Sequence, residues 1–205
     1  VGGTKNTAVG MDALYSNVGG NFNTAMGYKA LNLSDASNNT AIGNSALRHN
    51  QTGDNNTAIG YEALYNNKSS SNTATGYQAL KGNVYGFQNT AMGYKALNLN
   101  DTSNNTAMGF SALSVGLKGS NNTAVGASAL KLNDASNNTA MGFSALARNM
   151  TGWSNTAVGA SALGFTQTGS ANTAMGYQAL VSNDNGENNT AMGYKALNLS
   201  DASNN

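Results

Sequence analysis

The sequence predicts an all-β fold, a parallel β-solenoid in which each repeat of 16 or 17 residues forms one coil. Three observations lead to this prediction. The string Asn-Thr-Ala-x-Gly recurs at nearly constant spacing through the sequence, and in every copy two further residues separate its Gly from an Ala-Leu pair. The chain also has 25 glycines but no proline, a residue that would remove a hydrogen-bond donor from a strand ladder.

The repeat Asn-Thr-Ala-x-Gly-x-polar-Ala-Leu has twelve copies, each followed by a connector of seven or eight residues. We predict one continuous array over residues 1–205, without a domain boundary. Both ends of the sequence fall within a repeat, so we expect the array to continue beyond this window. The copies begin at Asn6, Asn23, Asn39, Asn56, Asn72, Asn89, Asn105, Asn122, Asn138, Asn155, Asn172 and Asn189.

Short strands fit this unit better than helices do. Helical repeats contain two helices, and each helix needs about ten residues with apolar side chains three and four positions apart. Here the motif has Gly at its centre, and the connector is rich in Asn, Ser, Asp and Gly, which favour turns. We therefore expect two short strands per coil, each paired in parallel with its equivalent one coil away at about 4.8 Å.

Alternation along the first strand divides its side chains between two faces. In the second copy, Thr24 and Met26 share one face, whereas Asn23, Ala25 and Gly27 share the other. Because the slot of Met26 holds Val, Met or Ile in eleven of twelve copies, we predict that it points into the coil. The opposite face has only Ala and Gly beyond the Asn, which suits close approach by another chain. The predicted assembly face comprises Ala25, Ala91 and Ala191.

The residues after the strand Gly form two further columns, a column being the equivalent residues of successive coils. The second residue after the Gly is polar in every copy, and we expect it to face water. The first is aromatic in eight copies, and these rings would stack along the axis: Tyr28, Tyr61, Tyr77, Tyr94, Phe110, Phe143, Tyr177 and Tyr194. The expected structural ladders are formed by Asn23, Thr24, Ala25, Met26, Gly27, Ala30, Leu31 and their equivalents.

Composition argues against several functions. The absence of cysteine excludes disulfide scaffolds, thiolate metal sites and cysteine nucleophiles. Ten basic and nine acidic residues are scattered singly, so we predict no nucleic-acid partner. No apolar run approaches the roughly 18 residues of a membrane span. The single histidine, His49, lies in a connector beside Arg48, and we predict no enzyme activity, catalytic residue, metal or cofactor.

Two columns have both a structural and a functional interpretation. The threonine column could order water, as in ice-binding solenoids, but a hydrogen-bonded and mainly buried threonine ladder is favoured. The Asn before each Thr often completes an Asn-Asn-Thr glycosylation motif. An amide ladder that closes the turn between coils is the favoured role of that Asn. The motifs begin at Asn38, Asn55, Asn104, Asn121, Asn137 and Asn188.

The connectors leave similar alternatives open. Asp35, Asp101, Asp134 and Asp201 could contact calcium, but no established calcium-loop pattern surrounds them, so solvated turns are favoured. Asp184 and Glu187 form a carboxylate pair in a connector that we expect at the surface. Trp153 could contact a glycan or another chain, although packing within its connector is the favoured interpretation.

The motif over residues 23–31, Asn-Thr-Ala-Met-Gly-Tyr-Lys-Ala-Leu, resembles the head repeats of trimeric autotransporter adhesins. It is still more similar to repeat arrays in phage tail fibres and bacterial surface proteins, and the resemblance covers the whole chain. The coil is longer than in the adhesin heads, with Thr where an apolar residue is usual. The resemblance implies a left-handed β-roll that self-associates as a homotrimer or filament, on a cell surface or a virion.

We therefore predict a structural fibre shaft made of stacked β-solenoid repeats, extracellular or on a virion. The alternative is an adhesin or tail-fibre module that binds a cell-surface or glycan receptor through its loops and aromatic ladders.

Overall fold

The computed structural model confirms an all-β, parallel β-solenoid. It describes residues 3–116 and 118–205, and in these ranges it contains strands and turns but no helix. The chain divides into two compact units, Val1–Asn104 and Asn105–Asn205, and each unit contains six copies of the repeat. The division falls between two copies, and one continuous array through both units stays a prediction.

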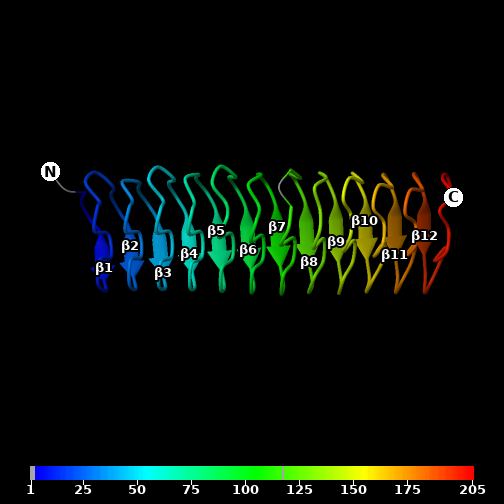
Figure 1. The fold of residues 1–205 in the computed structure, drawn as a ribbon, viewed down its shortest axis with the longest axis horizontal. Coiled ribbons are helices and arrows are strands. Elements are labelled where there is room, and N and C mark those ends of the chain that lie inside the picture. Colours follow the sequence, from blue (N-terminus) through cyan, green and yellow to red (C-terminus); the bar gives the residue numbers. More distant parts are fainter. Residues whose placement is uncertain (1–2, 117) are drawn as a thin grey trace. The chain divides into compact units, whose positions relative to one another are not determined.

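In the first unit, the strands of successive coils pair in parallel and lie side by side (Figure 1). The register is constant, with Thr opposite Thr and Ala opposite Ala in every pair. The strands are β1 (Thr7–Val9), β2 (Thr24–Met26), β3 (Thr40–Ile42), β4 (Thr57–Ile59), β5 (Thr73–Thr75) and β6 (Thr90–Met92).

The second unit repeats this arrangement with the same register. Its strands are β7 (Thr106–Met108), β8 (Thr123–Val125), β9 (Thr139–Met141), β10 (Thr156–Val158), β11 (Thr173–Met175) and β12 (Thr190–Met192).

Each coil has one three-residue strand in the described part of the chain, rather than the two that we predicted. The cause is a set of three corners per coil where a residue other than glycine has positive φ. In the second coil these corners are Lys29 (φ 54°), Leu31 (φ 48°) and Asn38 (φ 59°). Such left-handed residues interrupt an extended strand. Outside the strands, the described residues form a single isolated bridge, between Val115 and Leu132.

Hydrogen bonds between coils continue through these corners. The N–H of Lys29 donates to the carbonyl of Met11 in the preceding coil, and the N–H of Leu31 donates to that of Ala46 in the next, both at 3.0 Å. Paired peptide groups at the corners offset the conformational cost of the left-handed backbone.

Glycine at the end of each strand is required by both conformation and space. Gly27 has a φ of 134°, and a Cβ added there would lie 2.6 Å from the carbonyl oxygen of Gly43 in the next coil. Because this oxygen belongs to the backbone, it could not move aside without breaking the stack.

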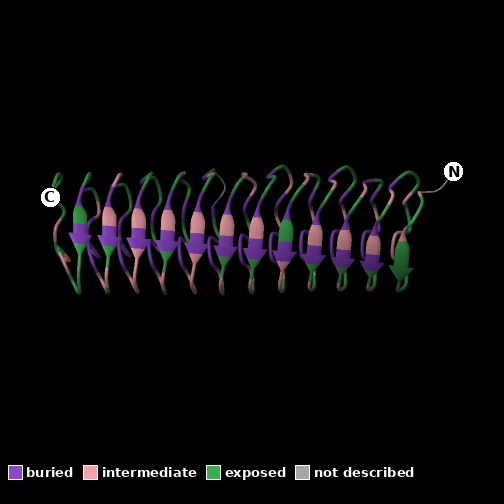
Figure 2. Ribbon diagram, turned by 180° about the vertical axis from the view of Figure 1, so that it is seen from behind, coloured by how far each residue is buried: buried purple, intermediate pink, exposed green. Residues whose placement is uncertain are grey.

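The interior is lined by the strand alanine and the Ala-Leu pair, which reverses the faces that we predicted. Ala25, Ala30 and Leu31 have no exposed surface, whereas Met26 is 47% exposed. Figure 2 shows this alternation along the strands, where buried and more exposed segments follow each other within a single arrow. The prediction that the Met26 slot points inward is therefore wrong. Three corners in 16 or 17 residues leave a narrow interior. A methyl group fits on the strand side opposite Leu, and we infer that a side chain as long as methionine would not.

The predicted assembly face is also wrong. Ala25 and Ala91 have no exposed surface and Ala191 is 3% exposed, so these methyl groups lie inside their own chain. The sorting of Thr24 with Met26, and of Asn23 with Ala25, is correct, but the first pair faces outward.

Candidate interaction surface

The asparagine that begins each strand forms a ladder between coils, as predicted. The Oδ1 atom of Asn56 accepts a hydrogen bond from the N–H of Asn72, 2.8 Å away in the next coil. Its Nδ2 atom donates to the carbonyl oxygen of Ser69 at 2.8 Å, within its own connector. Because Asn56 is fully buried, each of these bonds satisfies a polar group that water cannot reach.

A second buried asparagine column, which we did not predict from the sequence, lies three residues after the leucine. Asn50, Asn67 and Asn83 have no exposed surface. The Nδ2 atom of Asn67 donates to Oδ1 of Asn50, and that of Asn83 donates to Oδ1 of Asn67, both at 2.9 Å. The available signal was that eight of the twelve copies have Asn at this connector slot.

Connector carboxylates cap backbone amides of the preceding coil. Asp35 accepts hydrogen bonds from the N–H groups of Gly19 and Val18, and these two bonds lower the pKa of its carboxyl group. Asp101 accepts from Val84 at 2.7 Å, and Asp201 accepts from Asn185 at 2.6 Å. These three carboxylates therefore act as turn caps, which supports the solvated-turn interpretation. In the described part of the chain, no group of three or more His, Cys, Asp or Glu residues could hold a metal ion.

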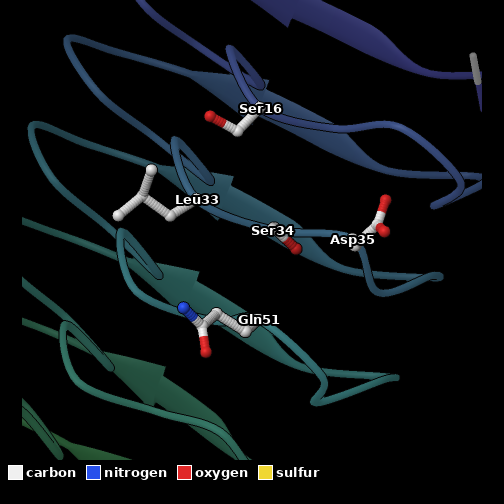
Figure 3. Close-up of a pocket in the computed structure, with 5 residues that line it drawn as sticks. All are labelled: Ser16, Leu33, Ser34, Asp35 and Gln51. Atoms are coloured by element: carbon white, nitrogen blue, oxygen red, sulfur yellow. The ribbon is translucent and has the colours of Figure 1, made fainter.

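An open groove lies beside Asp35 on the connector side of the coils (Figure 3). Its lining comes from three successive coils: Ser16, Leu33, Ser34, Asp35 and Gln51. The Asp35 carboxylate is already hydrogen-bonded to the preceding coil, and Ser34 is buried. Among the residues that line this groove, no nucleophile is held against a base.

The remaining connector residues of interest lie at the surface. Trp153 is 57% exposed, so the interpretation of Trp153 as a packing residue is wrong. Asp184 and Glu187 are both solvent-accessible, as expected. The His49 ring packs edge-on against Tyr65 with centroids 4.8 Å apart, and its pKa is lowered by burial and then by the Arg48 charge.

The strand threonines form an accessible column on the outer face. Most are half-buried, and Thr7, Thr73 and Thr190 are exposed. Within the described residues their hydroxyl groups make no hydrogen bonds, so the favoured interpretation of a buried, hydrogen-bonded threonine ladder is wrong.

The outer face also carries an apolar column at the slot of Met26, here called the x column. All eight methionines of the chain are between 40% and 72% exposed, and six of them belong to this column. Val9, Ile42 and Ile59 extend it in the first unit at 53%, 36% and 40% exposure. Within each unit, several exposed apolar side chains thus recur on one face, and contiguous exposed apolar surface is typical of interaction sites.

The aromatic column lies two residues beyond the x column, and its rings stack as predicted. Tyr61 and Tyr77 have ring centroids 5.3 Å apart, and Tyr77 and Tyr94 have centroids 5.2 Å apart, with planes within 10° of parallel. In the second unit, Tyr177 and Tyr194 stack at 5.4 Å. Stacked rings cover much of each other's faces, so the column presents mainly ring edges and hydroxyl groups.

A group of polar side chains lies beside this aromatic column, with Glu62 and Gln78 from the polar slot and Lys81 from the connector. The Lys81 ammonium lies 2.7 Å from Glu62 Oε2, and Gln78 Nε2 donates to the same oxygen at 2.8 Å. Burial raises the pKa of Glu62, but the Lys81 and Gln78 bonds outweigh it and hold that pKa below its usual value. The neighbouring Glu62 charge raises the pKa of Tyr61. The prediction that this slot faces water is only partly met, since most of its residues are half-buried.

Comparison with protein-family models, curated proteins and solved structures finds no match to this chain. Among the described residues, no helix is long and apolar enough to cross a membrane.

Proposed function

We propose that this chain is a structural segment of a fibre, a shaft built from stacked β-solenoid coils. The observation that supports this most is the direction of its internal bonds. Strand hydrogen bonds, both asparagine columns and the connector carboxylates all join one coil to the next. Interactions that repeat along one direction let a chain gain length by adding repeats, as in other solenoid proteins.

The outer face supplies the surface for self-association. The x column repeats once per coil, with a spacing fixed by strand pairing at about 4.8 Å. A second copy of the chain has an x column with the same spacing. The two columns can therefore contact each other along their whole length. We therefore infer that copies associate through the x and aromatic columns, as a homotrimer or a filament.

The location proposed for this shaft is the cell surface or a virion. It rests on the resemblance of the Asn23–Leu31 motif to adhesin heads and phage tail fibres. The proposed role is mechanical and does not involve catalysis.

Two matched deletions test the shaft. Removal of residues 56–88 or of residues 122–154 takes out two whole repeats and restores the register at the junction. Each variant should fold, keep its association state, and lose about 10 Å of its longest dimension in small-angle scattering. Removal of residues 56–63 breaks the register and should unfold the neighbouring coils. Unfolding of both whole-repeat deletions would contradict the proposal.

Receptor binding is a second candidate, favoured by exposed aromatic residues in the connectors. Tyr85, Phe87 and Trp153 are 69%, 48% and 57% exposed. Such side chains can contact a glycan or a protein receptor. The same two deletions separate the candidates on a glycan array or on receptor-bearing cells. A shaft gives the same result after either deletion, whereas a binding module loses binding when its own connector is removed.

A further inference from the structure

We propose that Asn185 is a site of self-catalysed deamidation, in which the backbone nitrogen of Gly186 attacks the Asn185 side-chain amide. Asn185 is the one Asn followed by Gly among 35 asparagines in the sequence. Glycine has no side chain to hinder the approach of its nitrogen. Asn185 is also exposed, so water can reach the product of the attack.

The hydroxyl group of Thr168 polarises the amide that is attacked. Its Oγ1 atom donates a hydrogen bond to Asn185 Oδ1 at 2.7 Å, from the equivalent slot of the preceding coil. A donor at this oxygen stabilises the negative charge that develops there when the carbon becomes tetrahedral. The Thr168 hydroxyl group therefore makes the Asn185 amide carbon more susceptible to attack.

The carboxylate of Asp201 lies at the attacking nitrogen. Its Oδ1 atom accepts hydrogen bonds from the N–H of Asn185 at 2.6 Å and from the N–H of Gly186 at 3.3 Å. A carboxylate at this position can take the Gly186 proton during the attack, as a general base. The preceding coil thus supplies the hydroxyl group of Thr168, and the following coil supplies the carboxylate of Asp201.

The reaction needs only water as a co-reactant. A bond forms between the Gly186 nitrogen and Asn185 Cγ, the bond from Cγ to Nδ2 breaks, and ammonia leaves with the proton passed on by Asp201. Water then opens the resulting succinimide ring at either carbonyl, giving aspartate or isoaspartate. The new carboxylate directly follows Asp184 in the sequence, and like charges repel. Isoaspartate also adds a methylene group to the backbone of this coil, which disturbs its register.

Other coils provide a matched control for this site. The slot before the connector glycine holds Thr52, Thr151 and Thr168 in three other copies. Asn185→Thr therefore removes the reactive amide while keeping a side chain that this fold already accepts. Thr168→Val removes the hydroxyl group at nearly constant volume, and Thr168→Ser restores it.

The experiment is peptide mapping of the full chain during incubation at neutral pH, with enzymatic methylation to count isoaspartate. The fragment that contains Asn185 should gain the mass of an amide-to-acid exchange and should incorporate heavy oxygen from labelled water. It should react faster in the folded chain than as an excised peptide of residues 182–189. Thr168→Val and Asp201→Asn should each slow the folded chain roughly tenfold, Thr168→Ser should react like the parent, and Asn185→Thr should not react.

The comparison of the parent chain with the peptide needs no substitution, so it holds even if a variant folds poorly. Reaction in the folded chain no faster than in the peptide would overturn the proposal. An unchanged rate in a folded Thr168→Val chain would overturn the role of the hydroxyl group.

Discussion

The two faces of the strand differ in a way that hydrophobicity does not predict. In β2, Ala25 is completely buried, whereas its larger neighbour Met26 is 47% exposed. Ala occupies its slot in all twelve copies, whereas the x column varies between Met, Val, Ile and Thr. An interior of constant width accepts one residue size at each position, whereas an outer surface tolerates several. Of the two apolar slots in the strand, the interior one is therefore the slot whose residue size is constant among the copies, and not the slot with the larger side chains.

The same comparison extends to the asparagines. The asparagines that precede β2 to β12 are buried and hydrogen-bonded between coils. Asn38, one residue before the buried Asn39, is instead exposed at a left-handed corner. The glycosylation motif at Asn38 thus begins outside the ladder, and its Thr40 lies half-buried in the strand. Asparagines thus have different roles according to whether their side chains point into the coil or towards solvent.

The largest expected effect comes from placing a charge on each face of β4. Ala58→Asp would put an unpaired carboxylate into the interior, and we expect a loss of more than about 3 kcal/mol of unfolding free energy, or failure to fold. Ile59→Asp, one residue away and outward, should change that free energy by less than about 0.5 kcal/mol. Circular dichroism during urea unfolding measures both, and equal losses would remove the distinction between the faces.

Ile59→Asp has a second use, because Ile59 belongs to the proposed association surface. The variant should stay folded but associate more weakly, as measured by analytical ultracentrifugation. Association unchanged in this variant and in Met26→Asp would argue against the x column as the contact surface.

A smaller effect is expected within the asparagine ladder. Asn56→Ala leaves the N–H of Asn72 and the carbonyl of Ser69 without these partners, at a cost of about 2 to 4 kcal/mol. Asn66→Ala, at a half-buried connector position, serves as the control and should cost less than about 0.5 kcal/mol. If the two substitutions have the same effect on the denaturation midpoint, the ladder does not stabilise the stack.

The smallest effect concerns pH. The pKa of Asp35 is lowered in the folded chain by the amides of Gly19 and Val18, from an ordinary value of 3.8. The carboxylate therefore stabilises the fold above that value, and this contribution disappears as the pH falls through the lowered folded pKa. Between about pH 5 and pH 2, Asp35→Asn should lose less stability than the parent chain. A parallel decline of the two urea midpoints would contradict this assignment.

Spacing alone predicted the period, the parallel register, the Asn56-type ladder and the Tyr61–Tyr77 stack. These features depend on which residues recur one coil apart, and the sequence states that directly. Which face of the strand points into the coil depends instead on the corners. Those corners lie at residues such as Lys29 and Leu31, whose types do not indicate positive φ. The second asparagine column was missed because Asn50 and Asn67 lie in connectors whose composition is typical of exposed turns.

Thiol labelling distinguishes the buried from the exposed face of the strand, because the chain has no cysteine of its own to react. The Ala58→Cys and Ile59→Cys variants are each treated with a maleimide under native conditions, at a series of protein concentrations. We predict that the thiol at 58 stays protected until the chain unfolds, whereas the thiol at 59 reacts readily in dilute solution and more slowly as copies associate. Rapid labelling at 58 together with protection at 59 in dilute solution would contradict the assignment of the alanine face to the interior and of the x column to the surface.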